Sequence, residues 1–424
     1  MIHYPLIVVG AGPAGFCAAV AAARMGVKTL LVEQYGMLGG AMTVGGVPYP
    51  MCFAAGGRQV IAGVGWELIE RLLRGGWARG RGERPYGCVD LDIAMTACEM
   101  DAMAQEAGVA LLLHCKLCEV RAQGEQILEA RFAAPEGLIS LKADAWIDAT
   151  GDGSLAYLAG AAFEMGDART HEVQPGSLGF WMDGYDLHAM QEETLQEAFQ
   201  RGRKTGKLIA GDYYGESVWP VLDLFAGHGL NKNHVDIPDV TAHSRTKAAL
   251  EGRERIARVL QWARESLPEA RGIYGAAICP EAWPRESRRI LGMSYVTAED
   301  YRQARRYADG ICHSYYPMDV HKKPADGAPA FELETHTLSP DRVPSIPLGA
   351  LVARDFSHLL VAGRCISGDR MAQSAYRVQA TCMGMGHAAG VAAAVRLASP
   401  GDMREVDAQA VRQALRAQKA VVPD

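Results

Sequence analysis

The sequence lacks any long run of basic residues. It carries 43 Lys and Arg against 49 Asp and Glu, so its net charge at pH 7 is −6 and its isoelectric point is near 6.1. Proteins that bind nucleic acid or an anionic membrane surface usually present a basic patch. The composition therefore argues against both of these partners and favours an enzyme that acts on a small molecule.

The signals of export and of membrane insertion are also missing. No Lys or Arg precedes the first apolar run, and this run leads into a glycine turn and not into a cleavage site. Residues 16–32 look apolar, but they contain Arg24 and Lys28 and divide into a helix and a strand. They do not predict a membrane span. We therefore expect a cytoplasmic protein.

The ten cysteines lack the paired C-x-x-C spacing of a zinc site, so we expect no metal. One C-x-x-C does occur, at Cys115 and Cys118, in a segment that predicts a strand over 111–118. The sequence favours a buried, reduced pair there over a redox-active dithiol. Internal repeats and low-complexity tracts are absent as well.

The chain does contain a glycine turn between two apolar runs near its start. Residues 6–9 predict a strand, the turn Gly10-x-Gly12-x-x-Gly15 follows, and an Ala-rich stretch predicts a helix. Gly10 permits a tight turn, Gly12 lets the backbone approach a pyrophosphate, and Gly15 lets the helix pack close to the strand. The alternative interpretation is an ordinary glycine-rich loop of a parallel α/β protein.

A second apolar run at 30–32 ends in Glu33, where a nucleotide ribose needs an acid. The helix N-terminus would face the phosphates with free N–H groups and a partial positive charge. Strand, glycine turn, helix and acid together predict a dinucleotide site.

The following residues continue an α/β pattern. Apolar residues at helical spacing predict helices over 58–74 and about 91–107. Short strands near 117–122, 127–133 and 138–142 predict an inserted β-meander. The strand at 145–148 then enters a second glycine turn, Thr150-Gly151-Asp152-Gly153, at the same edge of the sheet as the first.

A change of composition near residue 164 predicts a second domain. Residues 165–345 contain most of the Trp, Tyr, His and Pro, with helices predicted near 190–205, 243–266 and 298–309. The last block returns to the first pattern, with a strand and a glycine at 359–363 and a small-residue helix at 380–397 that could pack only at very close range. The predicted order is a nucleotide-binding domain over 1–164, an inserted domain over 165–345 and the rest of the nucleotide-binding domain over 346–424.

Five ordered motifs resemble one known family. They are Gly10-x-Gly12-x-x-Gly15, Leu38-Gly39-Gly40, Ile147-Asp148-Ala149-Thr150-Gly151-Asp152-Gly153, Glu286-Ser287-Arg288-Arg289-Ile290 and Val361-Ala362-Gly363-Arg364-Cys365-Ile366-Ser367. Together they resemble the bacterial FAD-dependent oxidoreductases of the glutathione reductase-like flavoprotein superfamily, which are relatives of the fumarate reductase and succinate dehydrogenase flavoproteins. The resemblance covers nearly the whole chain. It implies an α/β fold: a Rossmann-like FAD-binding domain, with a parallel sheet and a β-meander, plus an inserted α+β substrate or cap domain.

The resemblance also implies which residues bind an extended FAD molecule. The implied contacts are Gly10, Gly12, Pro13, Ala14, Gly15, Glu33, Gln34, Leu38, Gly39, Gly40, Thr43, Leu117, Thr150, Gly151, Asp152, Gly363, Arg364, Ser367 and Met383. Residues 36–50 contain no histidine like the one that tethers FAD in the respiratory relatives, so non-covalent binding is expected. No C-x-x-x-x-C follows Glu33, and no second G-x-G-x-x-G is present. These absences argue against disulfide reductase chemistry and against a tightly bound pyridine nucleotide.

The helix that begins at about Thr381 to Gly384 has a physical role of its own. Flavin that accepts a hydride at N5 develops negative charge near N1, and a helix N-terminus aimed there stabilises that charge. Close packing against the first glycine helix explains the small residues equally well.

The expected function is that of an FAD-dependent oxidoreductase that transfers a hydride between a small polar metabolite and flavin N5. Such an enzyme needs a base, and we propose His321 for this role, with Arg288 and Arg377 orienting the substrate; a structural or surface role is the alternative for each. Two other functions stay open: a flavoprotein electron-transfer subunit of a larger redox complex, and a nucleotide-binding protein without redox activity. The sequence leaves open the substrate, the electron acceptor, a redox partner and a homo-oligomer.

Overall fold

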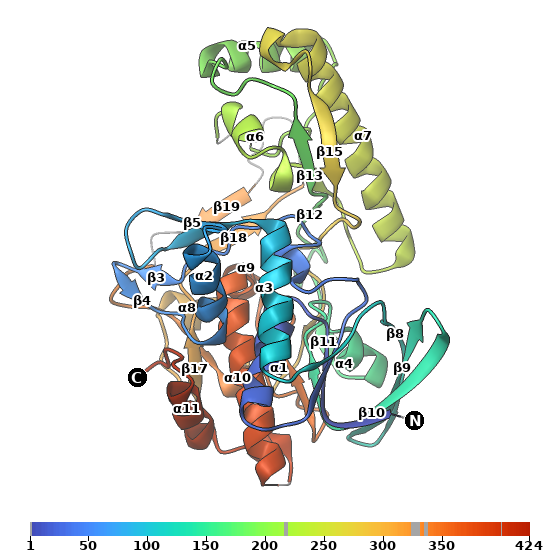
Figure 1. The fold of residues 1–424 in the computed structure, drawn as a ribbon, viewed down its shortest axis with the longest axis vertical. Coiled ribbons are helices and arrows are strands. Elements are labelled where there is room, and N and C mark those ends of the chain that lie inside the picture. The colour runs from blue at the N-terminus through green and yellow to red at the C-terminus, as the bar shows by residue number, and fades with distance from the viewer. Residues whose placement is uncertain (1, 216–218, 324–330, 335–337, 400) are drawn as a thin grey trace.

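A computed structural model describes residues 2–215, 219–323, 331–334, 338–399 and 401–424. The chain folds into two parts, shown in Figure 1. The larger part is built on a seven-stranded sheet. The smaller part stands above it in this view and is dominated by the long helix α7 (Ala242–Ser266).

The sheet has the strand order β7-β2-β1-β10-β9-β8, and β21 also pairs with β10. Its strands are β1 (Ile2–Val9), β2 (Thr29–Val32), β7 (Ala110–Leu112), β8 (Lys116–Gln123), β9 (Gln126–Ala134), β10 (Gly137–Asp148) and β21 (Leu359–Val361). The pairs among β7, β2, β1, β10 and β21 are parallel, whereas β8, β9 and the start of β10 form an antiparallel meander. The predicted α/β fold with a parallel sheet and a meander is confirmed.

Two details of the sheet differ from the prediction. The strand expected over 111–118 is interrupted, because His114 has a φ of 58° and so leaves the extended conformation. Cys115 is buried but Cys118 is exposed, so the prediction of a buried pair is wrong. The last strand of the meander and the next parallel strand are one continuous element, β10, which pairs first with β9 and then with β1.

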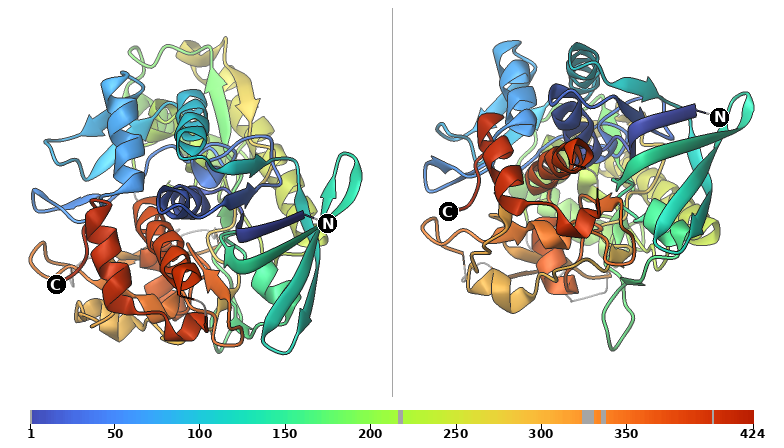
Figure 2. Two further views of the ribbon diagram at one scale, coloured as in Figure 1. Left: turned by 60° about the horizontal axis from the view of Figure 1, so that its bottom comes forward. Right: turned by 90° about the horizontal axis from the view of Figure 1, so that it is seen from below.

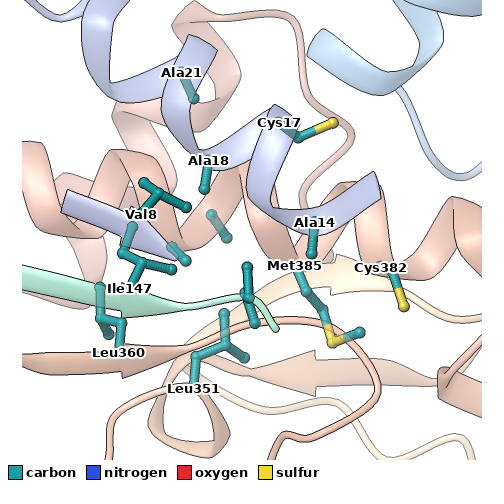
Figure 3. Close-up of a cluster of buried hydrophobic side chains, with 14 of the residues drawn as sticks. Val8, Ala14, Cys17, Ala18, Ala21, Ile147, Leu351, Leu360, Cys382 and Met385 are labelled. Atoms are coloured by element: carbon teal, nitrogen blue, oxygen red, sulfur yellow. The ribbon is translucent and has the colours of Figure 1, made fainter. Parts of the chain in front are cut away.

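Two helices with small side chains cross beside β1 at very close range. They are α1 (Pro13–Arg24) and α10 (Gln379–Ala398), which lie side by side in Figure 2. Figure 3 shows Ala14 and Ala18 of α1 in the same buried cluster as Met385 of α10. A Cβ atom on Gly386 would lie only 2.0 Å from the carbonyl oxygen of Ala14, so only glycine fits there. The predicted close packing of the small-residue helix is confirmed.

Helices α2 (Val64–Arg74), α3 (Ile93–Glu106) and α11 (Ala408–Ala417) complete this layer. His387 of α10 links the start of α2 to Gln418, the residue that follows α11. The backbone N–H of Val64 donates to Nδ1 of His387 at 3.4 Å, and Nε2 of the same ring lies 3.0 Å from Oε1 of Gln418. Burial lowers the pKa of His387 to about 4, so the ring is neutral and serves as an uncharged acceptor and donor.

The smaller part has a hydrophobic core of its own, formed by residues between Leu178 and Ala282. Its helices are α5 (Glu192–Lys204), α6 (Leu222–Ala226) and α7, so the helices predicted near 190–205 and 243–266 are confirmed. They pack on the pair formed by β13 (Phe180–Asp183) and β15 (Tyr274–Ile278). Further along the chain, Ile290, Val296 and Ile311 are buried in the core of the larger part. The domain boundaries after residues 164 and 345 stay a prediction.

The third predicted helix, over 298–309, is shorter than expected. α8 (Ala298–Arg302) begins at the predicted capping box of Thr297 and Asp300, but Ala304 has a φ of 49°, a left-handed conformation in which a helix cannot continue.

The remaining strands are short. They are β3 (Ala54–Ala55), β4 (Arg58–Gln59), β5 (Ala78–Arg81), β6 (Cys88–Leu91), β11 (Phe163–Glu164), β12 (Gly176–Ser177), β14 (His234–Val235), β16 (Arg289–Ile290), β17 (Gly310–His313), β18 (Met318–His321), β19 (Phe331–Glu334) and β20 (Ser345–Pro347). A six-residue helix, α4 (Ser154–Ala159), follows β10, and α9 (Arg370–Tyr376) precedes α10. Within the described residues, no helix has both the length and the apolar character needed to cross a bilayer.

The contact between α1 and α10 can be tested with Gly390→Ala. In an unobstructed helix this change favours folding by about 1 kcal/mol. Here the added methyl group would lie 2.1 Å from the carbonyl oxygen of Ala18, so the helices must move apart. Overpacking of this kind costs roughly 1–3 kcal/mol, and we expect a lower free energy of unfolding in urea. Gly87→Ala is the control, because its Cβ would meet nothing within 4 Å. A Gly390→Ala chain as stable as the wild type would contradict this account of the packing.

Candidate functional site

Three glycine loops at the carboxyl ends of β1, β10 and β21 meet at one cavity of about 710 Å³. This is the edge of a parallel sheet at which ligands bind in open α/β folds. The predicted residues that line it are Gly10, Gly12, Pro13, Ala14, Glu33, Gln34, Gly40, Leu117, Thr150, Gly151, Asp152, Gly363, Arg364, Arg288 and Arg377. The structure therefore brings together most of the residues that the motifs singled out.

The first glycine turn is shaped by backbone contacts. Gly10 has a φ of 95°, and a Cβ atom on it would lie 2.6 Å from the carbonyl oxygen of Ala149 in the second glycine loop. A Cβ atom on Gly15 would lie 1.8 Å from the carbonyl oxygen of Gly10. Gly12 differs from both, because a Cβ there would meet nothing within 4 Å. Gly12 also precedes the first turn of α1, with no side chain capping the free N–H groups. The helix N-terminus is thus open toward the cavity.

Glu33 is hydrogen-bonded to the backbone of the first glycine turn. Its carboxylate accepts hydrogen bonds from the backbone N–H groups of Ala11 at 2.6 Å and Tyr35 at 3.0 Å. Burial raises the pKa of Glu33 to about 7, against the effect of the backbone donors. The acid lies at the end of β2, where the motif predicts the ribose contact.

Seven predicted residues are not among those that line the cavity: Gly15, Leu38, Gly39, Thr43, Ser367, Met383 and His321. Several of them support the loops from behind. The hydroxyl of Thr43 donates to the carbonyl of Leu38 at 2.6 Å, and the N–H of Gly39 donates to Ala11 O at 2.8 Å. Met383 packs against Gly65 of α2, and Ser367 is buried. Their contacts with a ligand stay a prediction.

An ion-pair network crosses the cavity wall between the two parts of the chain. Asp152 pairs with Arg364 at 2.5 Å and with Arg245 of α7 at 2.6 Å, and Arg245 also pairs with Glu281. Burial opposes the charged form of Asp152, but the charges of Arg364 and Arg245 outweigh it and lower its pKa. Sequence reasoning missed Arg245 and Glu281, because they belong to no motif and come from the smaller part.

Arg288 lies at another point of the wall. Its guanidinium carbon sits 3.7 Å from the centroid of the Tyr157 ring, and its Nη1 donates to the carbonyl of Asp152 at 3.3 Å. Burial lowers the pKa of Arg288. Its predicted role as a substrate-orienting residue stays a prediction.

Helix α10 brings its first turn to the cavity. It begins at Gln379, one residue before the predicted helix of 380–397, and its N-cap residue Val378 makes no side-chain capping bond. Gln379 and Cys382 line the cavity. The side-chain amide of Gln379 donates to the carbonyl of Val47 at 2.7 Å, while its Oε1 is buried and has no hydrogen-bond partner in the described part of the chain. Positive partial charge at this helix end is therefore directed at the cavity.

Arg377 connects the cavity to a buried polar cluster. Its Nη2 donates to the carbonyl of Asp319 at 3.1 Å and to Oε1 of Gln174 at 3.4 Å. Nε2 of His321 lies 3.1 Å from Oδ2 of Asp319. Burial, and then the charge of Arg285, lower the pKa of His321 to about 3, so this ring is neutral at physiological pH. His321 stands behind Arg377 and not on the cavity wall.

Comparison with known proteins relates the chain to one family. A family model described as FAD dependent oxidoreductase matches residues 5–415. Dihydrolipoyl dehydrogenase of Trypanosoma brucei brucei is 50% identical over 46 residues, which are 11% of this chain and 10% of that enzyme. The chain thus spans about a tenth of the length of that curated relative.

Solved structures resemble the chain more distantly. A geranylgeranyl bacteriochlorophyll reductase-like protein of Thermoplasma acidophilum is 13% identical, with a TM-score of 0.46, over 99% of this chain and 84% of that chain. A p-nitrophenol 4-monooxygenase of Pseudomonas putida is 12% identical, with a TM-score of 0.41, over 98% and 84% of the two chains.

The ion-pair network can be tested with Asp152→Asn, which leaves two buried guanidinium groups without their shared carboxylate. Removing one partner of a buried ion pair costs roughly 3–5 kcal/mol, and we expect about 3 because Arg245 retains Glu281. Asp144→Asn is the control, since its pair with His3 is half exposed and is worth less than about 1 kcal/mol. Urea unfolding measures both.

The same network predicts a pH dependence. A lowered folded-state pKa means that the contribution of Asp152 is present above its ordinary pKa of 3.8 and is lost only as the pH falls through the folded value. The stability difference between Asp152→Asn and the wild type should therefore be at least as large at pH 5 as at pH 7. Burial raises the pKa of Glu281 to about 7, so at pH 5 this residue is protonated and Asp152 is the carboxylate on which Arg245 depends. A difference that disappears by pH 5 would show that the carboxylate is not held in its charged form.

Proposed function

The chain belongs to the FAD dependent oxidoreductase family, and from this premise we propose that it transfers a hydride between a small polar metabolite and its FAD cofactor. The observation that carries the proposal is the meeting of three glycine loops, Glu33 and the first turn of α10 at one cavity. Its volume of about 710 Å³ lies within the range of roughly 300–1,000 Å³ typical of ligand sites.

The residues present fit the cofactor. Gly12 leaves open space at the uncapped N-terminus of α1, which suits a pyrophosphate. Glu33 presents a carboxylate at the end of β2, which suits ribose hydroxyls. Bound FAD would supply the two-electron chemistry of hydride transfer. The first turn of α10 would stabilise negative charge on a group bound in the cavity.

Three side chains are proposed to act on the substrate. Arg377 and Arg288 line the cavity and present planar donors that suit a carboxylate or hydroxyl groups. His321 is proposed as the base. Its Nε2–H is directed at Asp319, so the neutral ring has Nδ1 as its basic nitrogen. A pKa near 3 makes a weak base, so this role requires a bound substrate to offset the nearby positive charge.

The proposal predicts a yellow protein whose flavin is reduced by a small metabolite. We expect the purified chain to show an oxidised flavin spectrum and to release free FAD on denaturation. Under anaerobic conditions, one class among hydroxy acids, amines and sugars should bleach this spectrum. Bleaching only in the presence of a partner protein would instead favour an electron-transfer subunit, and a colourless protein that fails to bind added FAD would contradict the proposal.

His321→Ala tests the proposed base. Flavin content should be unchanged, because His321 does not line the cavity, whereas reduction by the active substrate should slow by roughly 10²–10⁴-fold, the usual contribution of a general base. His387→Ala is the matched control, since His387 is equally buried but its hydrogen bonds go to Val64 and Gln418. An unchanged reduction rate in His321→Ala would remove His321 from the mechanism.

A further inference from the structure

A buried cluster of polar side chains adjoins the cavity on the side of Arg377. The cationic cluster consists of Gln174, His234, Arg285, Asp319, His321 and Arg377, which are held together by hydrogen bonds and ring contacts. Resting on the proposed function, we propose that Arg285 and Arg377 bind a carboxylate group of the substrate.

Arg285 is buried, with 8% of its surface exposed. Its guanidinium donates to the carbonyl of Pro175 at 3.1 Å, to Oδ1 of Asn231 at 3.2 Å and to Nε2 of His234 at 2.7 Å. All three partners are uncharged, and no carboxylate of the described residues forms an ion pair with it. Arg289, close by in sequence, shows the usual arrangement: it is just as buried but pairs with Glu286 at 2.7 Å. A buried guanidinium with only neutral partners is costly and favours an anion.

His234 adds no negative charge to the cluster. Because its Nε2 accepts from Arg285, the imidazole is neutral and carries its proton on Nδ1. The ring stacks on Tyr214 with centroids 3.8 Å apart and lies 4.9 Å from the ring of His321. Burial and the charge of Arg285 hold the pKa of His234 well below its ordinary value, which agrees with a neutral ring.

The charges of the cluster leave an excess of one positive unit. Arg285 and Arg377 are cationic, and Asp319 is the single carboxylate, with Oδ2 at 3.9 Å from Nη2 of Arg377. Burial raises the pKa of Asp319, but the hydrogen bond from His321 and the charges of both arginines outweigh it and lower the pKa to about 2. One monoanion balances the cluster. A carboxylate fits this count, whereas a phosphate ester carries roughly 1.5–2 negative charges at pH 7.

The hydrogen-bonding groups of the cluster point to the same ligand. Three of its buried donors have no partner within the described residues: Nε of Arg377, Nε2 of Gln174 and Nδ1 of His234. Of the carboxylate oxygens of the cluster, Oδ1 of Asp319 also has no hydrogen-bond partner within the described residues. Unsatisfied buried donors are rare and call for an acceptor. A carboxylate, which only accepts, satisfies an excess of donors and forms a paired contact with guanidinium groups.

The position of the cluster suits a substrate that reacts in the cavity. Arg377 lines the cavity together with Gln379 and Cys382 in the first turn of α10. Trp283, two residues before Arg285, lines it as well. Through Arg377, a carboxylate bound at the cluster would lie next to the cavity that holds the rest of the substrate.

The inference is tested by ligand binding to the oxidised holoenzyme, without turnover. Acetate, propanoate and benzoate are titrated in parallel with acetamide, propanamide and benzamide, and with inorganic phosphate, while the flavin absorbance is recorded. We expect at least one carboxylate to perturb the spectrum and its amide to bind at least tenfold more weakly. If no carboxylate binds better than its amide, or if phosphate binds more tightly than every carboxylate, the inference is overturned.

Variants assign the binding to the two arginines. Arg285→Gln and Arg377→Gln should each weaken binding of the carboxylate by roughly ten- to a hundredfold, as expected for loss of a charged hydrogen-bonding group. Arg285→Lys, which keeps the charge but not the planar donors, should show an intermediate loss. Arg412→Gln is the control: Arg412 is equally buried and donates to Gly310 O and Pro423 O, far along the chain from the cluster.

The outcomes separate this inference from the proposed function. Wild-type affinity in both Arg285→Gln and Arg377→Gln, with FAD retained, overturns the inference even if the enzyme reduces its flavin normally. Carboxylate binding that is lost in these variants supports it even if no compound of the metabolite panel bleaches the flavin. Thermal unfolding of each holoenzyme confirms that the variants are folded, and Arg285→Lys serves if Arg285→Gln is not.

Discussion

The structure depends on backbone contacts at positions that have no Cβ atom. Gly15 lies against the carbonyl of Gly10, Gly10 lies against Ala149, and Gly386 lies against Ala14. These contacts join α1, the loop after β10 and α10 in one stack, in which a single methyl group would force the layers apart. The loops that line the cavity take their positions from this stack. The glycines therefore act twice, since they permit the local turns and they also fix the distance between elements far apart in sequence.

Ion pairs connect the smaller part of the chain to the loops of the larger part. Arg245 lies near the start of α7, a helix whose apolar face belongs to the second core, and it reaches Asp152 in the loop after β10. Arg364 approaches the same carboxylate from the loop after β21. One buried carboxylate thus holds two guanidinium groups from different parts of the chain. Because a buried charge without a partner is costly, the pair between Arg245 and Asp152 holds the start of α7 against the loop after β10.

The sequence was sufficient for the parts of the fold that are encoded locally. The glycine turn, the parallel strands, the meander and the small-residue helix each show a periodicity or spacing within a few residues, and each was found. Cys118, the end of α8 and the break at His114 depend on backbone conformations or exposure that no local pattern reports. Arg245 and Arg285 were missed for another reason: their roles arise only when the smaller part folds back onto the sheet. His321, which was proposed from the sequence as the base, is not among the residues that line the cavity.

The uncompensated charge of Arg285 and the low pKa of His321 have a common origin. Burial makes a positive charge costly on either side chain. The charges of Arg285 and Arg377 further disfavour protonation of His321. A bound anion would offset the positive charge, so it would stabilise the two guanidinium groups and raise the pKa of His321 at the same time. The ring would then become a better base only when substrate is present. Recognition of the substrate and readiness for proton transfer would thus be one electrostatic event, and an enzyme without substrate would keep a neutral, weakly basic imidazole in its cluster.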